Sequence, residues 1–151
     1  MQSLNLPPCQ PRLSIKNGKK FIFDPLRRKE VALTPEEWVR QHFVHFLLTT
    51  RNYPPERIAN EVSINLNAAI KRCDTVVYDD YLKPLVIIEY KAPDVSISSE
   101  VFDQISRYNA ALHVPYLMVS NGLTHFCCFL DYLKMEYRFL EDIPNYRDIK
   151  G

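Results

Sequence analysis

The stretch from Lys71 to Pro93, KRCDTVVYDDYLKPLVIIEYKAP, predicts the centre of the fold. Its two runs CDTVVYD and PLVIIEY are rich in β-branched and aromatic residues, and they flank a polar connector at residues 79–83. This is the pattern of two strands joined by a short hairpin loop. The second run is apolar on both faces, which indicates a central strand. Glu89 and Lys91 lie two residues apart in or just after it, so their side chains point to the same face of the sheet.

A symmetric hairpin brings a second carboxylate to the same place. If the turn is centred between Tyr81 and Leu82, Asp74 lies opposite Glu89, with the Cβ atoms roughly 4.5 to 5.5 Å apart. Two like charges at this spacing destabilise a sheet unless a positive charge lies between them, and a divalent cation and Lys91 are the candidates. The pattern therefore predicts a metal-dependent hydrolytic site. The alternative is an ordinary ion-pair cluster at a strand end.

These residues resemble the PD-(D/E)XK nuclease motif, in which an acid is followed, after a gap, by an acid-x-Lys triplet. Asp74 and Glu89-Tyr90-Lys91 have this form. The flanking sequence more closely resembles the N-terminal endonuclease domain of type I restriction enzyme R subunits. The matching segments are TPEEWVRQ at 34–41, KRCD at 71–74, QISRY at 104–108 and Asn121-Gly122.

The resemblance implies an α/β fold with a restriction-endonuclease-like core, a central mixed β-sheet flanked by helices. It also implies a Mg²⁺-dependent endonuclease that hydrolyses DNA phosphodiester bonds. Asp74, Glu89 and the backbone carbonyl of Tyr90 would hold Mg²⁺, or Mn²⁺ as a substitute, because these hard ions favour oxygen ligands. Lys91 would position a water molecule or stabilise charge on the phosphate.

A helix predicted from Thr34-Pro35 to about Thr50 contributes a further acid. Glu37 lies three residues after Thr34, where it can close a capping box, a purely structural role. The resemblance instead implies that Glu37 completes the metal shell, directly or through water. Glu36 is the alternative for this first-helix acid.

A second helix is predicted from Ser98 to about His113. Val101, Ile105, Tyr108 and Leu112 recur on it at helical spacing, which indicates packing on the sheet. Gln104 and Tyr108 are one turn apart, and the resemblance implies that they orient Lys91 or the substrate phosphate. Spacing alone places Tyr108 in the core.

The remaining segments complete the predicted fold. Residues 1–11 form an irregular arm, and a hairpin turning at Asn17-Gly18 follows. A strand is expected at 60–66. Glu61 at its start is either a further acid of the site or, as we interpret it, an exposed strand-end carboxylate. After the second helix come a strand PYLMVS, parallel to the central one, and two more strand-like runs, LTHFCCFL and KMEYRFL. The final Asp148-Ile149-Lys150 repeats the acid-x-Lys form, but we interpret it as a chance match in a polar tail.

Composition sets limits on the function. The 151 residues fit a single domain, and 46% hydrophobic with 25% charged residues is typical of a soluble protein. No apolar run approaches the roughly 20 residues of a membrane span, and no signal peptide is evident, which predicts a cytoplasmic protein without a membrane partner. The four cysteines are expected to be free thiols. The net charge is +1, yet residues 16–30 carry +4. This basic edge would either bind a phosphate backbone or be an ordinary solvated surface.

Two departures from the R subunits bear on the function. The chain has three glycines and no GxxxxGK[ST] loop, so we do not expect it to be an ATP-driven translocase by itself. Cys73 stands where the motif has proline. The predicted partners are DNA and other restriction or repair subunits, and the sequence does not specify an oligomeric state. The alternative is a catalytically silent module that binds DNA or a protein on the same fold.

Overall fold

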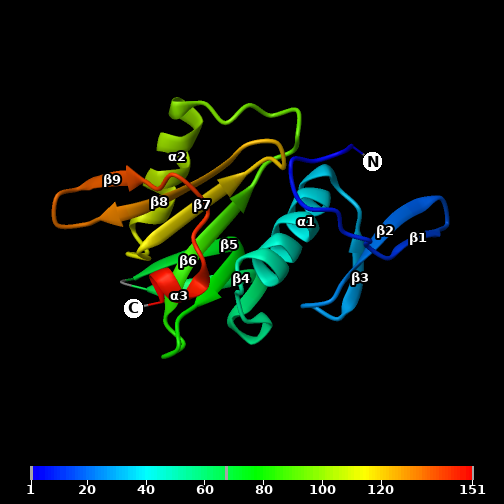
Figure 1. Ribbon diagram of the computed structural model, residues 1–151, viewed down its shortest axis with the longest axis horizontal. Helices are drawn as coiled ribbons and strands as arrows, with labels where there is room; N and C mark the ends of the chain where they lie inside the picture. The colour runs from blue at the N-terminus through cyan, green and yellow to red at the C-terminus, as the bar shows by residue number, and fades with distance from the viewer. Residues whose placement is uncertain (1, 67, 151) are drawn as a thin grey trace.

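A six-stranded mixed sheet forms the centre of the molecule, and a smaller three-stranded antiparallel sheet stands beside it (Figure 1). This computed structural model describes residues 2–66 and 68–150. The central strands lie in the order β4-β5-β6-β7-β8-β9, and neighbours are antiparallel except for β6 and β7. Their bounds are β4 Ile58–Leu66, β5 Ala69–Tyr78, β6 Pro84–Tyr90, β7 Tyr116–Ser120, β8 His125–Asp131 and β9 Glu136–Phe139. The predicted mixed α/β fold is confirmed.

The β5–β6 hairpin has the register expected from the sequence. Thr75 pairs with Ile88, and Val77 pairs with Val86. The register then shifts by one residue between Val77 and Tyr78, so the turn itself is not symmetric. One step beyond the Thr75–Ile88 pair, the same register places Asp74 opposite Glu89.

The small sheet contains β1 Leu13–Lys16, β2 Lys19–Asp24 and β3 Lys29–Ala32. Asn17 and Gly18 have φ angles of 52° and 77°, the left-handed values that a tight hairpin turn requires. The sequence predicted only the β1–β2 hairpin. It missed β3, because KEVA is four residues long and half charged. The preceding arm is irregular as predicted, although Met1 lies outside the described residues.

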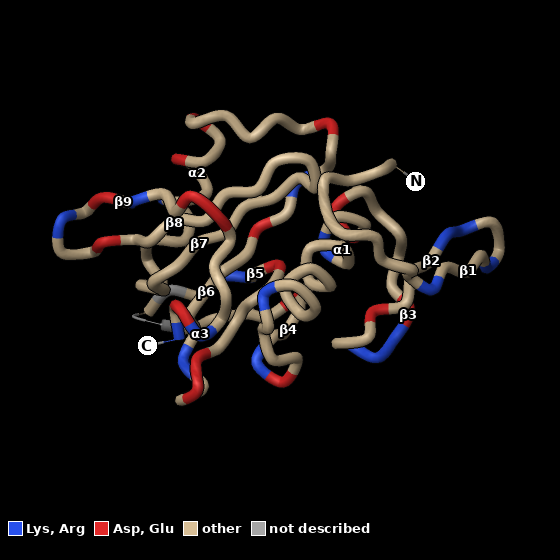
Figure 2. The backbone as a smooth tube through the Cα atoms, viewed as in Figure 1, with Lys and Arg blue, Asp and Glu red and all other residues tan. Residues whose placement is uncertain are grey.

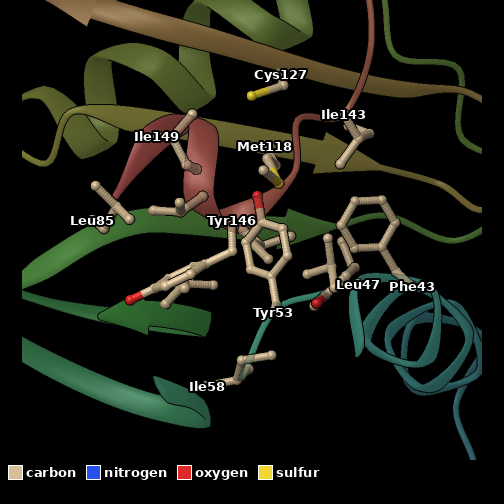
Figure 3. Packing of buried hydrophobic residues seen from close by; sticks show 14 of the residues in the cluster. Phe43, Leu47, Tyr53, Ile58, Leu85, Met118, Cys127, Ile143, Tyr146 and Ile149 are labelled. Carbon is tan, nitrogen blue, oxygen red and sulfur yellow. The ribbon is translucent and has the colours of Figure 1, made fainter. Parts of the chain in front are cut away.

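Helix α1, Pro35–Thr50, and the short helix α3, Tyr146–Ile149, pack on one face of the central sheet (Figures 1 and 3). A short 3₁₀ turn, η1, follows α1 at Pro55–Arg57. The expectation of a polar C-terminal tail is wrong. Ile143, Tyr146 and Ile149 are buried, and the Tyr146 hydroxyl donates to the Tyr78 carbonyl at 3.0 Å. In the sequence, these three apolar residues recur at every third position among polar ones, which is only a weak signal for a helix. Their packing against the sheet stabilises it.

Helix α2, Ser99–Ala110, covers the opposite face of the sheet. It is the crossover between the parallel strands β6 and β7, as predicted. The helix ends at Ala110 rather than near His113, whose φ of 55° is incompatible with a continuing helix. Tyr108 is not part of the core, since it is 48% exposed and its ring centroid lies 4.0 Å from the Lys71 ammonium.

All four cysteines are free thiols, and three of them are buried. Within residues 2–66 and 68–150, no helix combines the length and apolar character needed to cross a membrane.

Candidate active site

Asp74 and Glu89 both line an open pocket of about 510 Å³ at the end of the β5–β6 hairpin. Its walls come from β3, the first turns of α1, and strands β4 to β6. Five more charged groups line it as well: Arg27, Glu36, Glu37, Arg40 and Glu61. The two acids predicted from the hairpin are therefore brought into one cavity.

Asp74 connects the ends of two strands. Its Oδ2 accepts a hydrogen bond from the Tyr90 amide at 2.9 Å, and its backbone carbonyl accepts one from the Arg40 guanidinium. Burial raises the pKa of Asp74, while the Tyr90 amide and the Arg40 charge oppose the rise. One carboxylate oxygen remains available for another ligand, since the hydrogen bond uses Oδ2.

Glu89 has the most perturbed carboxyl group of the pocket. Burial, and then repulsion from Asp74, raise its pKa from an ordinary value of 4.5 to about 7, and the Lys91 charge partly offsets both. No hydrogen bond contributes to this pKa among the groups that the structure describes. Two adjacent carboxylates with raised pKa values are a pair that a divalent cation would stabilise.

Lys91 is half-buried and follows β6 directly. Its backbone amide donates to the Ser120 carbonyl at 2.9 Å, which anchors it to the end of β7. Its positive charge lowers the pKa of both Asp74 and Glu89, so it lies within electrostatic reach of the pair. It is not among the residues that line the pocket. Its role in catalysis stays a prediction.

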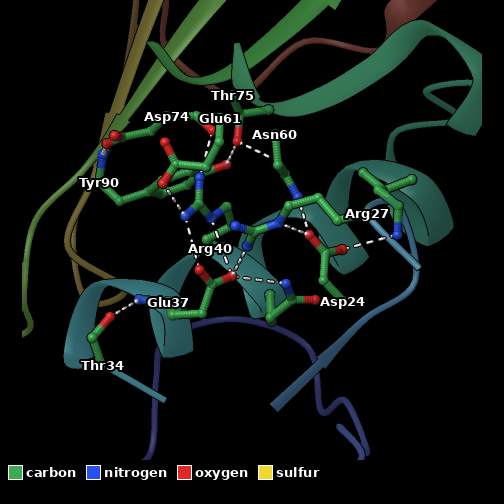
Figure 4. A network of polar contacts seen from close by, with 12 residues as sticks. Asp24, Arg27, Thr34, Glu37, Arg40, Asn60, Glu61, Asp74, Thr75 and Tyr90 are labelled. Carbon is green, nitrogen blue, oxygen red and sulfur yellow. Dashed lines mark hydrogen bonds and ion pairs between the residues drawn. The ribbon is translucent and has the colours of Figure 1, made fainter. Parts of the chain in front are cut away.

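Glu37 lies in a network of cations (Figure 4). Arg40 Nη2 donates to one of its oxygens at 2.8 Å, while Arg27 Nη2 and Gln41 Nε2 donate to the other at 2.7 and 2.9 Å. Burial would raise the pKa of Glu37, but these hydrogen bonds outweigh it and hold the pKa below its ordinary value. A direct metal bond from Glu37 would have to displace one of these donors.

The capping-box alternative for Glu37 is only half fulfilled. The Thr34 hydroxyl accepts from the Glu37 amide at 3.0 Å, as an N-cap should. The Thr34 amide, however, donates to the Ala32 carbonyl, and the Glu37 side chain turns toward Arg40. Glu36 is exposed and borders the same pocket.

Arg40 is a site residue that sequence reasoning missed. It is 6% exposed, and its guanidinium joins Glu37, Glu61 and the Asp74 carbonyl, with the Glu61 contact at 2.9 Å. Although burial alone would lower the pKa of Arg40, these acidic partners raise it above its ordinary value. The available signal was its spacing, since Arg40 lies three residues after Glu37 on one helix face.

Glu61 also belongs to the site, contrary to the expectation of an exposed strand-end carboxylate. It lies within β4, opposite Asp74, between the pairs Asn60–Thr75 and Val62–Cys73. Its φ of 55° is a left-handed value that is uncommon for a non-glycine residue and turns the side chain toward Arg40. Strained backbone of this kind is frequent at functional sites.

A second chain of hydrogen bonds supports the pocket on the α1 side of the central sheet. The Tyr90 hydroxyl donates to Thr75 Oγ1 at 3.0 Å, and Thr75 donates to Asn60 Oδ1 at 2.7 Å. Asn60 Nδ2 in turn donates to Asp24 at 2.9 Å. This chain connects the small sheet to β4, β5 and β6, so the position of the Tyr90 backbone is fixed from the α1 side.

Gln104 and Tyr108 are not brought into the pocket. Both side chains are exposed on α2, and neither lines the cavity that contains Asp74 and Glu89. Their role in orienting Lys91 or a phosphate stays a prediction.

The donors in the pocket fit a hard cation that keeps several water ligands. Among the residues that the structure describes, no three or more His, Cys, Asp or Glu side chains converge as a ready metal cage. Mg²⁺ does not require one, because it is usually held by one or two carboxylates together with water and substrate phosphate. Asp74, Glu89 and the Tyr90 carbonyl provide a ligand set of this kind.

The fold and site together define an α/β domain with a pair of perturbed carboxylates at the end of its central hairpin. The family described as Type I restriction enzyme R protein N terminus matches residues 35–144, so the chain belongs to this family. No curated protein sequence matches the chain.

The solved structures that resemble the domain include the following two. One is a fragment of a protein described as an HsdR subunit of a type I restriction enzyme from Vibrio vulnificus YJ016. It has a TM-score of 0.53 and 17% identity over 78% of this chain, which spans only 24% of that chain. The other is the cryo-EM structure of a DrdV–DNA complex, with a TM-score of 0.46, 14% identity, and coverage of 76% of this chain and 11% of that chain. At this identity the first likeness concerns the fold alone.

Proposed function

We propose that this domain is a PD-(D/E)XK-type nuclease that hydrolyses DNA phosphodiester bonds with Mg²⁺ or Mn²⁺. Membership of the type I restriction R-protein family supports a restriction-type role. The observation that carries the proposal is the pairing of Asp74 and Glu89 in one pocket, where the pKa of each carboxyl is raised.

Asp74, Glu89 and the carbonyl of Tyr90 would hold the ion. When bound, the metal would polarise the scissile phosphate and lower the pKa of a coordinated water. Glu37 would act through water, because both of its oxygens already accept hydrogen bonds from neighbouring side chains.

The chain's own residues have separate tasks in this proposal. Lys91 would offset negative charge that develops on the phosphate, which an ammonium does without changing its protonation. Arg40 would hold the Asp74 backbone in place through their hydrogen bond. Gln104 and Tyr108 would orient the phosphate or Lys91 from α2.

Translocation along DNA lies outside this proposal. The chain spans about a quarter of the Vibrio fragment that it resembles, and the sequence contains no phosphate-binding glycine loop. We propose that DNA is the substrate and that other restriction or repair subunits are the partners.

A plasmid-nicking assay tests the function. Wild-type protein is incubated with supercoiled DNA and Mg²⁺ or Mn²⁺ and compared with Asp74→Asn, Glu89→Gln and Lys91→Met. Each substitution should lower the nicking rate by at least about 100-fold, because each removes a group that stabilises charge at the reacting phosphate. Gln104→Ala, measured in the same assay, tests the α2 contribution separately.

The control is Asp94→Asn, which neutralises an exposed carboxylate after β6. It should nick like the wild type. Wild-type protein that binds DNA without nicking it under any of these conditions would contradict the proposal and favour a silent binding module.

A further inference from the structure

The small sheet carries most of the protein's unbalanced positive charge. Residues 12–32 contain seven Lys and Arg residues against two acids, although the whole chain has a formal net charge of +1. Figure 2 shows these cations along the β1–β2 hairpin and around β3, on the part that stands beside the central sheet. The positive field is therefore local, and the remainder of the chain is net negative.

The two acids of this sheet leave much of that charge unbalanced. Asp24 is buried and pairs with Arg27, while Glu30 pairs with Lys16. Five further exposed cations form no salt bridge within the part of the chain that the structure describes: Arg12, Lys19, Lys20, Arg28 and Lys29.

Strand pairing divides these cations between two faces. Ile22 pairs with Val31 across β2 and β3, and Val31 lines the acidic pocket. Because side chains alternate along a strand, Lys20 and Lys29 share the face of Ile22 and Val31. Lys19 lies on the opposite face. Lys20 and Lys29 are thus exposed at the two ends of one face of the small sheet, whose middle residues Ile22 and Asp24 are buried. Lys29 lies two residues from Val31, which lines the pocket.

We propose that this surface, defined by Lys20 and Lys29 with Arg28 at the β2–β3 turn, docks the phosphate backbone of duplex DNA beside the acidic pocket. The inference rests on the proposed nuclease function for its choice of ligand. A polyanion approaching Asp74 and Glu89 meets net negative charge, so attraction has to come from neighbouring cations. Cations contribute to DNA affinity by replacing condensed counterions, and the number of contacts is read from the salt dependence.

Salt-dependent DNA binding tests the surface. Fluorescence anisotropy of a labelled duplex is measured in EDTA over a range of KCl concentrations, so no cleavage can occur. Lys20→Gln/Lys29→Gln should reduce the slope of log affinity against log salt by about 2, one for each lost phosphate contact. Its affinity in low salt should fall by about tenfold or more.

The matched control is Lys83→Gln/Lys134→Gln, which removes the same charge from exposed positions at the β5–β6 and β8–β9 turns. This variant should keep the wild-type slope. An equal loss in the control would show that net charge alone drives binding and would overturn the proposal. So would a wild-type slope in Lys20→Gln/Lys29→Gln, or displacement of the DNA by polyglutamate at equal charge concentration.

The two proposals fail separately. If wild-type protein binds DNA with the expected difference in slope but does not nick plasmid, the surface stands and the nuclease function falls. If wild-type protein nicks plasmid while Lys20→Gln/Lys29→Gln binds and nicks like the wild type, the docking surface falls alone. Thermal melting of each variant confirms that folding is unchanged, since these lysines are exposed.

Discussion

Neutralising Glu89 should stabilise the metal-free protein at alkaline pH. The folded state raises the pKa of this carboxyl from 4.5 to about 7, mainly through burial and then through Asp74. A raised carboxyl pKa means that the folded state binds the proton more tightly than the unfolded state does. The associated stability is therefore present below about pH 4.5 and is lost as the pH rises through about 7.

The size of the effect follows from the shift in pKa. Each pKa unit corresponds to about 1.4 kcal/mol, so ionised Glu89 costs the folded state roughly 3 kcal/mol at pH 8.5. Glu89→Gln is nearly isosteric and removes the charge. It also removes the charge repulsion between Glu89 and Asp74. For a domain of this size the gain corresponds to a rise in melting temperature of roughly 5 to 10 °C.

The assay is urea denaturation in EDTA at pH 5 and at pH 8.5. Glu89→Gln should exceed the wild type by roughly 3 kcal/mol at the higher pH and by much less at the lower one. Glu136→Gln, an exposed carboxylate on β9, is the control and should show no such difference. If Glu89→Gln is less stable than the wild type at pH 8.5, or if its advantage does not depend on pH, the reasoning about this pocket is refuted.

Three further substitutions test the surrounding contacts. Arg40→Met removes one of two guanidinium partners from Glu37, which keeps Arg27, and from Glu61, which keeps Arg72, and should cost about 1.5 to 3 kcal/mol in urea denaturation; a cost below about 1 kcal/mol would show that the network is unimportant. Tyr90→Phe removes the hydrogen bond to Thr75 and should cost about 1 kcal/mol, while Mn²⁺ affinity stays unchanged because only the Tyr90 carbonyl is a proposed ligand. Lost Mn²⁺ affinity in a folded Tyr90→Phe protein would contradict that assignment. Thr34→Ala should lower stability by about 1 kcal/mol by removing the α1 cap, and unchanged stability would be evidence against the cap.

The elements that the sequence predicted well are those with strong local signals. The β5–β6 register followed from an apolar run of fixed length and a polar connector, even though the turn contains a register shift. The start of α1 followed from Thr34-Pro35, and the β1–β2 turn from Asn17-Gly18. In each case a few adjacent residues determine the backbone conformation.

The features that the sequence missed depend on distant partners. Arg40 is a buried cation because Glu37, Glu61 and the Asp74 carbonyl surround it, and these groups come from three elements. Helical spacing wrongly predicted Tyr108 to be buried, because periodicity does not show how far the sheet extends beneath α2. The pairing of Asp74 with Glu89 was predictable, whereas the cationic network that holds the neighbouring wall was not.

The central claim is that Asp74 and Glu89 together bind a hard divalent cation. Calorimetric titration of Mn²⁺ at pH 7, in two buffers of different ionisation enthalpy, tests it most directly. Because the pKa of Glu89 is raised to about 7, binding should release about half a proton at this pH, and Asp74→Asn and Glu89→Gln should each abolish or greatly weaken it. Absence of Mn²⁺ binding by the wild type, or binding that both variants retain, would contradict the account.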